Sequence, residues 1–422
     1  MKYMEKRIRI SHTIEKQREK TYYAVPFSVP EGVERMTVSY YYEKGTKAAP
    51  NVVDLGLSDE KGRFVGWSGG ARQSVTVGPC EATPGYWMTE IGPGEWQILV
   101  GAYKIAGQSL VVEYEVTFYE KEARWLFGDL HCHSTASDGA LSSWELAQRA
   151  RRMGFDFLAV SDHNNYCGNY SLPKVPGLTM IPAVEWTHYK GHMNFFGAAA
   201  PFENSFVANT QAEMLNLVRQ AKESGALVSA NHPKCPFCPY LWEDDSCFDL
   251  MEIWNGPMRR ANMDALAWWH RFLVQGRKLP VVGGSDFHRD KSPVRLGNPV
   301  TAVFCASPAA EDIVEAIRQG HCYVTESIKG VRLELEGSCF GDTLKGQRGK
   351  TLRFKATGGK QGMRFCLVSD AGMVCETSRW KGKEATLEVA AGQEKFFYAA
   401  VYRRAFGKSW LCAISNPVYL EA

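Results

Sequence analysis

Strand-like apolar runs alternate with helical patterns through the middle of this chain, between residues 123 and 326. This alternation is typical of a parallel sheet whose strands are joined by right-handed helical crossovers. Ser142 or Ser143 can cap the first helical pattern. The helical patterns cover 142–153, 210–224, 263–275 and 309–318. The strand-like runs cover 125–130, 157–161, 180–184, 193–196, 227–230, 250–254, 281–284 and 301–305. So many strand-like runs favour a TIM-like α/β barrel over an open sheet.

The two ends of the chain have a different pattern. Residues 1–122 hold β-rich runs separated by glycine and proline turns, which predicts an N-terminal β-sandwich or jelly-roll-like domain. Residues 328–422 return to short strands punctuated by glycine, which predicts a small C-terminal β-sandwich. We therefore expect a multidomain protein with three domains, at 1–122, 123–327 and 328–422, and we place catalysis in the central one.

Composition narrows the class of protein. Apolar residues make up 45% and charged residues 23%, as in ordinary globular proteins, and no apolar run is long enough for a membrane span. The charged N-terminus lacks the apolar core of a secretory signal, so we expect a cytoplasmic protein with free thiols. The net charge of +3 gives no support for nucleic-acid binding. The pair Cys235 and Cys238 is interpreted as structural, with a zinc or redox role as the alternative.

Histidines and carboxylates follow the strand-like runs at their ends. Barrel enzymes build their sites at the carboxyl ends of the strands, so these side chains should meet. Polar residues end six of the first seven strand-like runs: His131 and His133, Asp162 and His163, Glu185, His232, Asn255, and Asp286 and His288. His192 lies at the start of the fourth run. The remaining histidines, His12, His188, His270 and His321, are interpreted as structural.

This set of residue types indicates a metal centre. In an extended segment, side chains two residues apart point the same way, so His131 and His133 can reach one ion, and so can Asp286 and His288. Imidazoles mixed with carboxylates suit Zn, Mn or Fe(II), whereas Ca and Mg prefer oxygen ligands alone. The donors exceed the needs of one ion, which predicts two or three divalent ions.

The same residues resemble a known family. The stretch at 128–134 (GDLHCHS) with Ser137, Asp138 and Gly139 resembles the first motif of the PHP (polymerase and histidinol phosphatase) superfamily. The stretch at 159–164 (AVSDHN) resembles the second motif, and Glu185, His232 and 285–288 (SDFH) resemble later ones. The chain is most similar to the CehA/McbA-like branch, in which β-rich regions often flank the PHP barrel.

The resemblance implies a distorted (β/α)7-type barrel with a di- or trinuclear metal centre. It implies a bridging role for Glu185 and a catalytic role for Asp286, and Asp162 is expected to orient a ligand or shuttle a proton. Asp138 stands where some relatives have histidine. The implied ligands are His131, His133 and Asp286 for a first ion, Glu185, His192 and His232 for a second, and Asp138, His163 and His288 for a third.

The function implied is metal-dependent hydrolysis of a small phosphomonoester or phosphodiester by a metal-bridging hydroxide. Lys234, Arg289 and Lys291 can reach a charged group, and Asn255 is a further substrate-binding candidate. The alternative is hydrolysis of a carboxyl ester, amide or carbamate, which apolar walls formed by Trp186, Trp254 and Phe287 would favour. A glycan- or protein-binding module without catalysis and an exonuclease are weaker alternatives.

Overall fold

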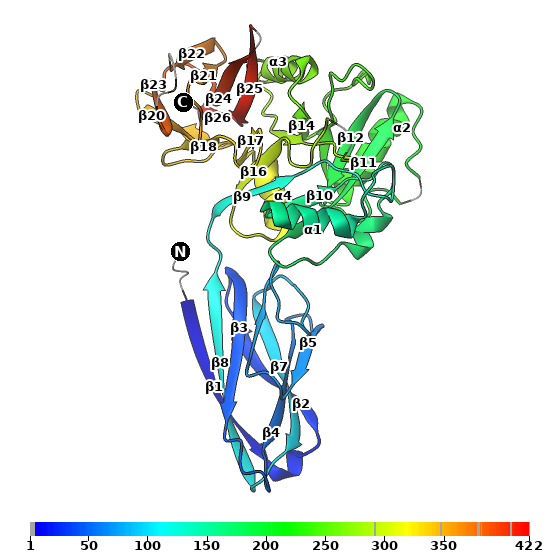
Figure 1. The fold of residues 1–422 in the computed structure, drawn as a ribbon, viewed down its shortest axis with the longest axis vertical. Coiled ribbons are helices and arrows are strands. Elements are labelled where there is room, and N and C mark those ends of the chain that lie inside the picture. The colour runs from blue at the N-terminus through cyan, green and yellow to red at the C-terminus, as the bar shows by residue number, and fades with distance from the viewer. Residues whose placement is uncertain are drawn as a thin grey trace. The chain divides into compact units, whose positions relative to one another are not determined.

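The chain divides into two compact units, Met1–Ala123 and Arg124–Ala422, each of which can be followed by colour in Figure 1. The structure is a computed structural model. It describes residues 5–203, 205–290, 293–346, 348–377, 380, 382–405 and 407–421. No helix within these ranges is both long and apolar enough to cross a membrane.

The first unit consists of two four-stranded antiparallel sheets around one core. Every second residue of β8 is buried over most of its length, as expected for a strand with one face against a core. Tyr40 and Tyr114 stack within this core at a ring distance of 5.9 Å. The first sheet has the order β1 (Glu5–Glu15), β8 (Ser109–Glu120), β3 (Val33–Tyr42), β6 (Ser74–Val77), and the second has the order β2 (Tyr22–Val29), β7 (Gly94–Lys104), β4 (Val52–Ser58), β5 (Phe64–Gly69).

The second unit is built on one long mixed sheet. Its strands β9, β10 and β11 are parallel, as are β13, β14 and β15, and β12 runs antiparallel between the two sets. The strands at this end of the sheet are β9 (Arg124–Asp129), β10 (Phe157–Val160), β11 (Thr179–His188), β12 (Gly191–Phe196), β13 (Leu227–Ala230), β14 (Leu250–Asn255), β15 (Val281–Gly284), β16 (Val300–Cys305) and β17 (Cys322–Thr325).

Four α-helices accompany this sheet in the part of the chain that the structure describes: α1 (Ser143–Met153), α2 (Gln211–Glu223), α3 (Arg260–Val274) and α4 (Ala310–Arg318). Ser142, one of the two caps that the sequence allowed, forms a reciprocal capping box with Glu145 at the start of α1, and Thr210 and Glu213 form one at the start of α2. Gly154 ends α1 in the left-handed conformation that only glycine adopts freely.

The prediction of a barrel is wrong in that the sheet does not close. Within the described residues, the ladder of paired strands runs open from β15 to β22 and does not close on itself. The physical reason is local: β11 and β12 form an antiparallel hairpin and β16 pairs antiparallel to β9, whereas the predicted barrel requires parallel neighbours. The loops after β9 and β15 still meet, because Cys132 and Phe287 form a parallel bridge.

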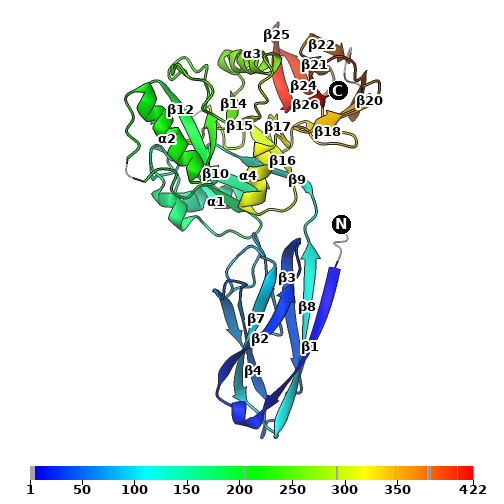
Figure 2. The same ribbon diagram turned by 180° about the vertical axis from the view of Figure 1, so that it is seen from behind.

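Most strands of the C-terminal region continue the same sheet, whereas β18, β20 and β23 form a separate three-stranded sheet. β25 pairs with β17, with Val324 opposite Ile414, and the Trp269 ring of α3 lies 5.0 Å from the Tyr398 ring of β24. The predicted C-terminal sandwich therefore shares one sheet with the central region, while the boundary at residue 328 stays a prediction. The region contains β18 (Arg332–Leu335), β19 (Thr343–Lys345), β20 (Thr351–Thr357), β21 (Arg364–Ser369), β22 (Gly372–Glu376), β23 (Glu384–Ala390), β24 (Phe396–Ala405), β25 (Lys408–Ser415) and β26 (Val418–Glu421), seen from behind in Figure 2.

Candidate metal centre

His131 and His133 extend from the end of β9 into a buried cluster of polar side chains. Strand alternation directs the intervening Cys132 to the opposite side, where its thiol donates to the Ala159 carbonyl at 3.4 Å. Gly284 allows the approach of His131, because a Cβ at that position would lie 2.3 Å from the His131 Cβ. The HxH spacing therefore brings two imidazoles into one site, as the sequence predicted.

Glu185, near the end of β11, lies at the centre of the cluster and is fully buried. Burial alone would raise the pKa of this carboxyl, but the imidazoles, His131 foremost, hold its pKa well below the ordinary value. The position fits a carboxylate shared between ions. Its two oxygens lie within 3.5 Å of ring nitrogens of five histidines: His131, His133, His163, His192 and His232.

Asp286 provides the second central carboxylate. Its Oδ1 lies 3.1 Å from His133 Nε2, 3.5 Å from His131 Nε2 and 3.6 Å from His288 Nδ1. Asp286 has a φ of +56° and His232 a φ of +28°, a region that residues with side chains rarely occupy. Backbone strain of this kind concentrates at functional sites, where it directs a side chain that regular strand geometry would turn away.

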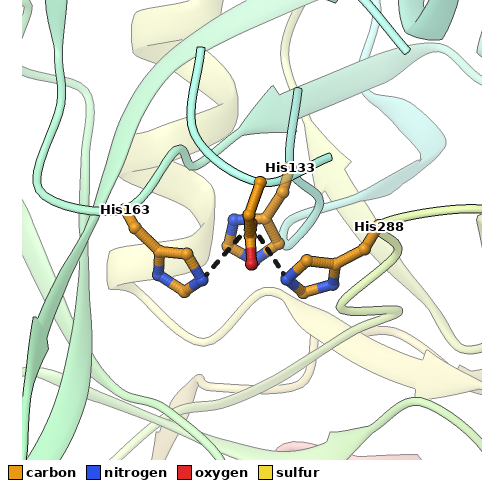
Figure 3. A group of neighbouring side chains, drawn as sticks. His133, His163 and His288 are labelled. Carbon is orange, nitrogen blue, oxygen red and sulfur yellow. Dashed lines mark ion pairs between the residues drawn. The ribbon is translucent and has the colours of Figure 1, made fainter. Parts of the chain in front are cut away.

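A rim of three further side chains lies closer to solvent. Asp138 Oδ1 is 3.6 Å from His163 Nε2 and 3.3 Å from His288 Nε2. The rings of His163 and His288 flank that of His133 at 4.3 and 4.1 Å between centroids (Figure 3). The Asp138 side chain is 53% exposed, whereas that of Glu185 is 1% exposed. The cluster therefore has a buried floor and an open mouth.

Two properties of the cluster fit a metal ion: its imidazole and carboxylate donors, and a buried ring nitrogen without a hydrogen-bond partner. His131 Nε2 is buried and has no hydrogen-bond partner among the described residues, which is costly unless something else binds there. Ligand atoms lie within 4.8 Å of one another in four groups. These groups are His131, Glu185 and His232; His131, His133 and Asp286; His133, Asp138, His163 and His288; and His192, His232 and Cys238.

Sequence reasoning missed the carboxylate that supports this cluster. Glu252 of β14 is buried, its Oε1 lies 2.9 Å from His131 Nδ1, and its Oε2 accepts from the His232 backbone N–H at 3.0 Å. The Asn231 amide, also missed, donates to Glu185 Oε1 at 2.9 Å. The only signal in the sequence was the place of Glu252 at the end of the sixth strand-like run.

Asp162 lies beside the cluster and organises the loop after β9. Its carboxylate accepts hydrogen bonds from the Ser134 backbone N–H at 2.8 Å, the Ser134 hydroxyl at 2.7 Å and the Ser137 hydroxyl at 2.7 Å. These bonds fix the loop that leads to Asp138. The structure thus gives Asp162 partners in the loop and none among the imidazoles of the described residues.

The substrate-binding candidates lie at different distances from the cluster. Asn255 donates to Asp286 Oδ2 at 3.3 Å and accepts from Arg259, a cation that sequence reasoning did not single out. Arg289 donates to the Asp138 carbonyl at 3.0 Å, at the rim. Lys234 instead lies over the Trp268 ring at 3.9 Å. Lys291 lies outside the described residues.

The expected aromatic walls are not at the mouth. Trp186, Trp254 and Phe287 are almost fully buried in the core, because each alternates with a polar strand-end residue that faces the cluster. Three exposed aromatics, Tyr189, Phe206 and Phe237, instead line a cavity that includes His192. His12 contacts Tyr23, His270 contacts Tyr398 and His321 contacts Asp342, so these three histidines belong to other parts of the structure.

Comparison with protein families matches residues 129–226 to the PHP domain. The chain contains a PHP domain. The match covers the ligand candidates from His131 to His192, and the later ones, His232, Asp286 and His288, follow it in sequence and join them in space. The CehA/McbA-like branch stays a prediction.

Two curated proteins share short segments with this chain. A 5′-3′ exoribonuclease of Haemophilus influenzae is 58% identical over 60 residues, which are 14% of this chain and 22% of that protein. The DNA polymerase/3′-5′ exonuclease PolX of Bacillus subtilis is 49% identical over 39 residues, 9% of this chain and 7% of that protein. The chain therefore spans less than a quarter of the length of either relative.

Two solved structures also match this chain, at lower sequence identity. A two-domain protein from Bacteroides vulgatus, containing a predicted PHP-like metal-dependent phosphoesterase, is 17% identical with a TM-score of 0.41, and the match covers 69% of this chain and 95% of that one. An amidohydrolase from Chromobacterium violaceum is 15% identical with a TM-score of 0.27, covering 39% and 89%.

Proposed function

We propose that this chain is a metal-dependent hydrolase of small phosphomonoesters or phosphodiesters. The observation that carries the proposal is the position of Glu185, a buried carboxylate within 3.5 Å of five imidazoles. So many convergent donors are expensive to bury unless they bind cations. The family match and the donor set together support a hydrolase that uses divalent ions, of which Zn, Mn and Fe(II) suit these ligands.

Each proposed ion has a set of ligands from this chain. Divalent ions at such a centre lower the pKa of a coordinated water and polarise the group that is attacked. Glu185 joins the two inner sets, and the outer set at the rim lies where a substrate arrives from solvent. The sets are His131, His133 and Asp286; His192 and His232 with Glu185; and Asp138, His163 and His288.

Two arginines close to the cluster support an anionic substrate. Arg289 lies at the rim beside Asp138, and Arg259 contacts Asn255, which in turn contacts Asp286. A guanidinium is well suited to a phosphate oxygen. The two curated relatives are an exoribonuclease and an exonuclease, both of which cleave phosphodiesters, and their similarity covers short segments.

One observation favours a second candidate, the hydrolysis of an uncharged carboxyl ester, amide or carbamate. The cavity beside His192 has no lysine or arginine among its described lining residues. A neutral substrate would need none. In this alternative the same ions would polarise a carbonyl in place of a phosphoryl group.

The test is turnover by the full chain reconstituted with Mn(II), on three p-nitrophenyl substrates: a phosphate monoester, a phosphate diester and a carboxylic ester. The control is the double variant His131→Ala/His133→Ala. Phosphoester turnover that disappears in the control would support the proposal. Carboxylic ester turnover alone, with the same dependence, would replace it with the second candidate. No turnover of any substrate would favour a binding module and count against both.

A further inference from the structure

A cavity of about 470 Å³ opens beside the proposed metal centre. It shares His192 and Cys238 with the fourth group of ligand candidates, so it is continuous with the site. A pocket of this size accommodates a small organic group, and a concave apolar surface next to reactive residues is the usual form of a binding site. Its other lining residues are Asn164, Thr187, His188, Tyr189, Phe206, Val207, Ala208, Asn209 and Phe237.

The walls carry large apolar side chains that are exposed to solvent. Phe237 is 91% exposed and Tyr189 is 99% exposed, and Phe206 and Val207 are also exposed. These four come from three separate segments: the β11–β12 turn, the β12–α2 loop and the β13–β14 loop. Apolar side chains that gather around one concavity mark an interaction site, whereas single ones scattered on a surface do not.

The walls are held in place by the protein itself. Trp186 donates from its indole N–H to the Phe206 carbonyl at 2.7 Å, and the His188 ring stacks on Trp186 at 5.5 Å. Cys238, next to Phe237, lies 3.5 Å from His232 Nδ1. The wall that carries Phe237 is thereby tied to a proposed metal ligand. These contacts order the two backbone segments that carry Phe206 and Phe237, which reduces the entropic cost of binding.

Most polar groups of the cavity already form hydrogen bonds within the protein. Asn164 bonds to the backbone of Thr187 through both atoms of its amide, and the Thr187 hydroxyl contacts His163 Nδ1 at 2.6 Å. The Lys190 backbone N–H donates to His188 Nδ1, so a neutral His188 carries its proton on Nε2. The cavity thus presents apolar and aromatic surface, with an imidazole N–H as a donor and without formal charge among its described lining residues.

We propose that this cavity is the leaving-group subsite and that it selects a flat, uncharged aromatic group, with the bond to be cleaved placed at the metal centre beside His192. The inference rests on the proposed hydrolase function. An aromatic ring buries much apolar area and stacks on Phe237 and Phe206, whereas an alkyl or sugar group would leave these side chains in water. Two kinds of substrate carry such a flat aromatic group: an aryl phosphate, whose ring is attached to the phosphoryl group, and a nucleotide, whose base is aromatic.

Binding measurements on the Mn(II)-loaded full chain test the subsite without requiring turnover. Calorimetric titrations compare phenylphosphonate with methylphosphonate for a ring attached to phosphorus, and adenosine 5′-monophosphate with ribose 5-phosphate for a nucleobase. We expect the aromatic member of at least one pair to bind roughly tenfold more tightly. That preference should disappear in Phe237→Ala. It should persist in Trp144→Ala, which removes an exposed aromatic of the same unit from outside the cavity.

The outcomes distinguish failure of the subsite proposal from failure of the hydrolase proposal. A preference that depends on Phe237, with or without phosphoester turnover, supports the subsite, and in the absence of turnover only the hydrolase proposal fails. Equal or undetectable binding within both pairs overturns the subsite, even if the protein hydrolyses phosphoesters. A preference that survives Phe237→Ala and Phe206→Ala also overturns it. Metal content measured on each variant shows whether the centre is intact.

Discussion

Glu252 Oε1 lies 2.9 Å from His131 Nδ1, while the other ring nitrogen of His131, Nε2, lies 3.3 Å from Glu185 Oε1. A carboxylate on Nδ1 fixes the tautomer that leaves Nε2 free to bind an ion, and it raises the basicity of the ring. Glu252 also accepts from the backbone N–H of His232. One buried carboxylate therefore positions two of the proposed ligands.

Glu252→Gln should weaken metal binding without removing a ligand. The amide keeps the size of the side chain but loses the charge that orients His131, and losses of this kind are typically about 10- to 100-fold in metal affinity. Titration of the metal-free protein with Zn(II) against a competing chelator measures the change. Glu223→Gln, an exposed glutamate of α2, is the matched control and should leave affinity unchanged. Wild-type affinity in Glu252→Gln would contradict the positioning role.

Glu185→Gln should impair metal binding more severely than Glu252→Gln. The neutral amide cannot bridge two cations, so the protein should lose at least one ion and its turnover. Metal content measured by mass spectrometry and turnover of the best p-nitrophenyl substrate check both expectations. A variant with full metal content and full activity would remove Glu185 from the site.

The sequence predicted the convergence of ligands better than the sheet that carries them. HxH spacing suffices to bring His131 and His133 together, because it follows from local backbone geometry. The strand-end position of Asp286 was visible in the sequence, but its φ of +56°, which turns the side chain toward the cluster, was not. The pairing of Val324 with Ile414 joins segments about 90 residues apart, and no local pattern encodes it. The exposed position of Phe237 could not be predicted either, since it lies in a loop and loops have no hydrophobic periodicity.

Asp138→Asn should affect the rim and leave the floor intact. Asp138 is half exposed and contacts only His163 and His288 of the cluster, so its loss removes a charge from the outermost set of ligands. We expect the variant to release its weakest-bound ion and to retain the others. Stepwise titration with Mn(II), followed by the paramagnetic signal of the free ion, resolves the sites. Loss of every ion would show that the three sets are not separable.

Gly284→Ala tests the close packing beneath His131. The added Cβ would lie 2.3 Å from the His131 Cβ and 3.0 Å from Glu252 Oε1, distances that force both side chains to move. Overpacking of this kind costs about 1–3 kcal/mol in the free energy of unfolding, and the displaced imidazole should also bind metal more weakly. Chemical denaturation of the metal-free protein measures the first effect, and chelator competition measures the second. Gly168→Ala is the control, because a Cβ there meets nothing within 4 Å. Equal stability and metal affinity in both variants would mean that the His131 backbone can shift to accommodate a methyl group, so that the position of its imidazole is not set by Gly284.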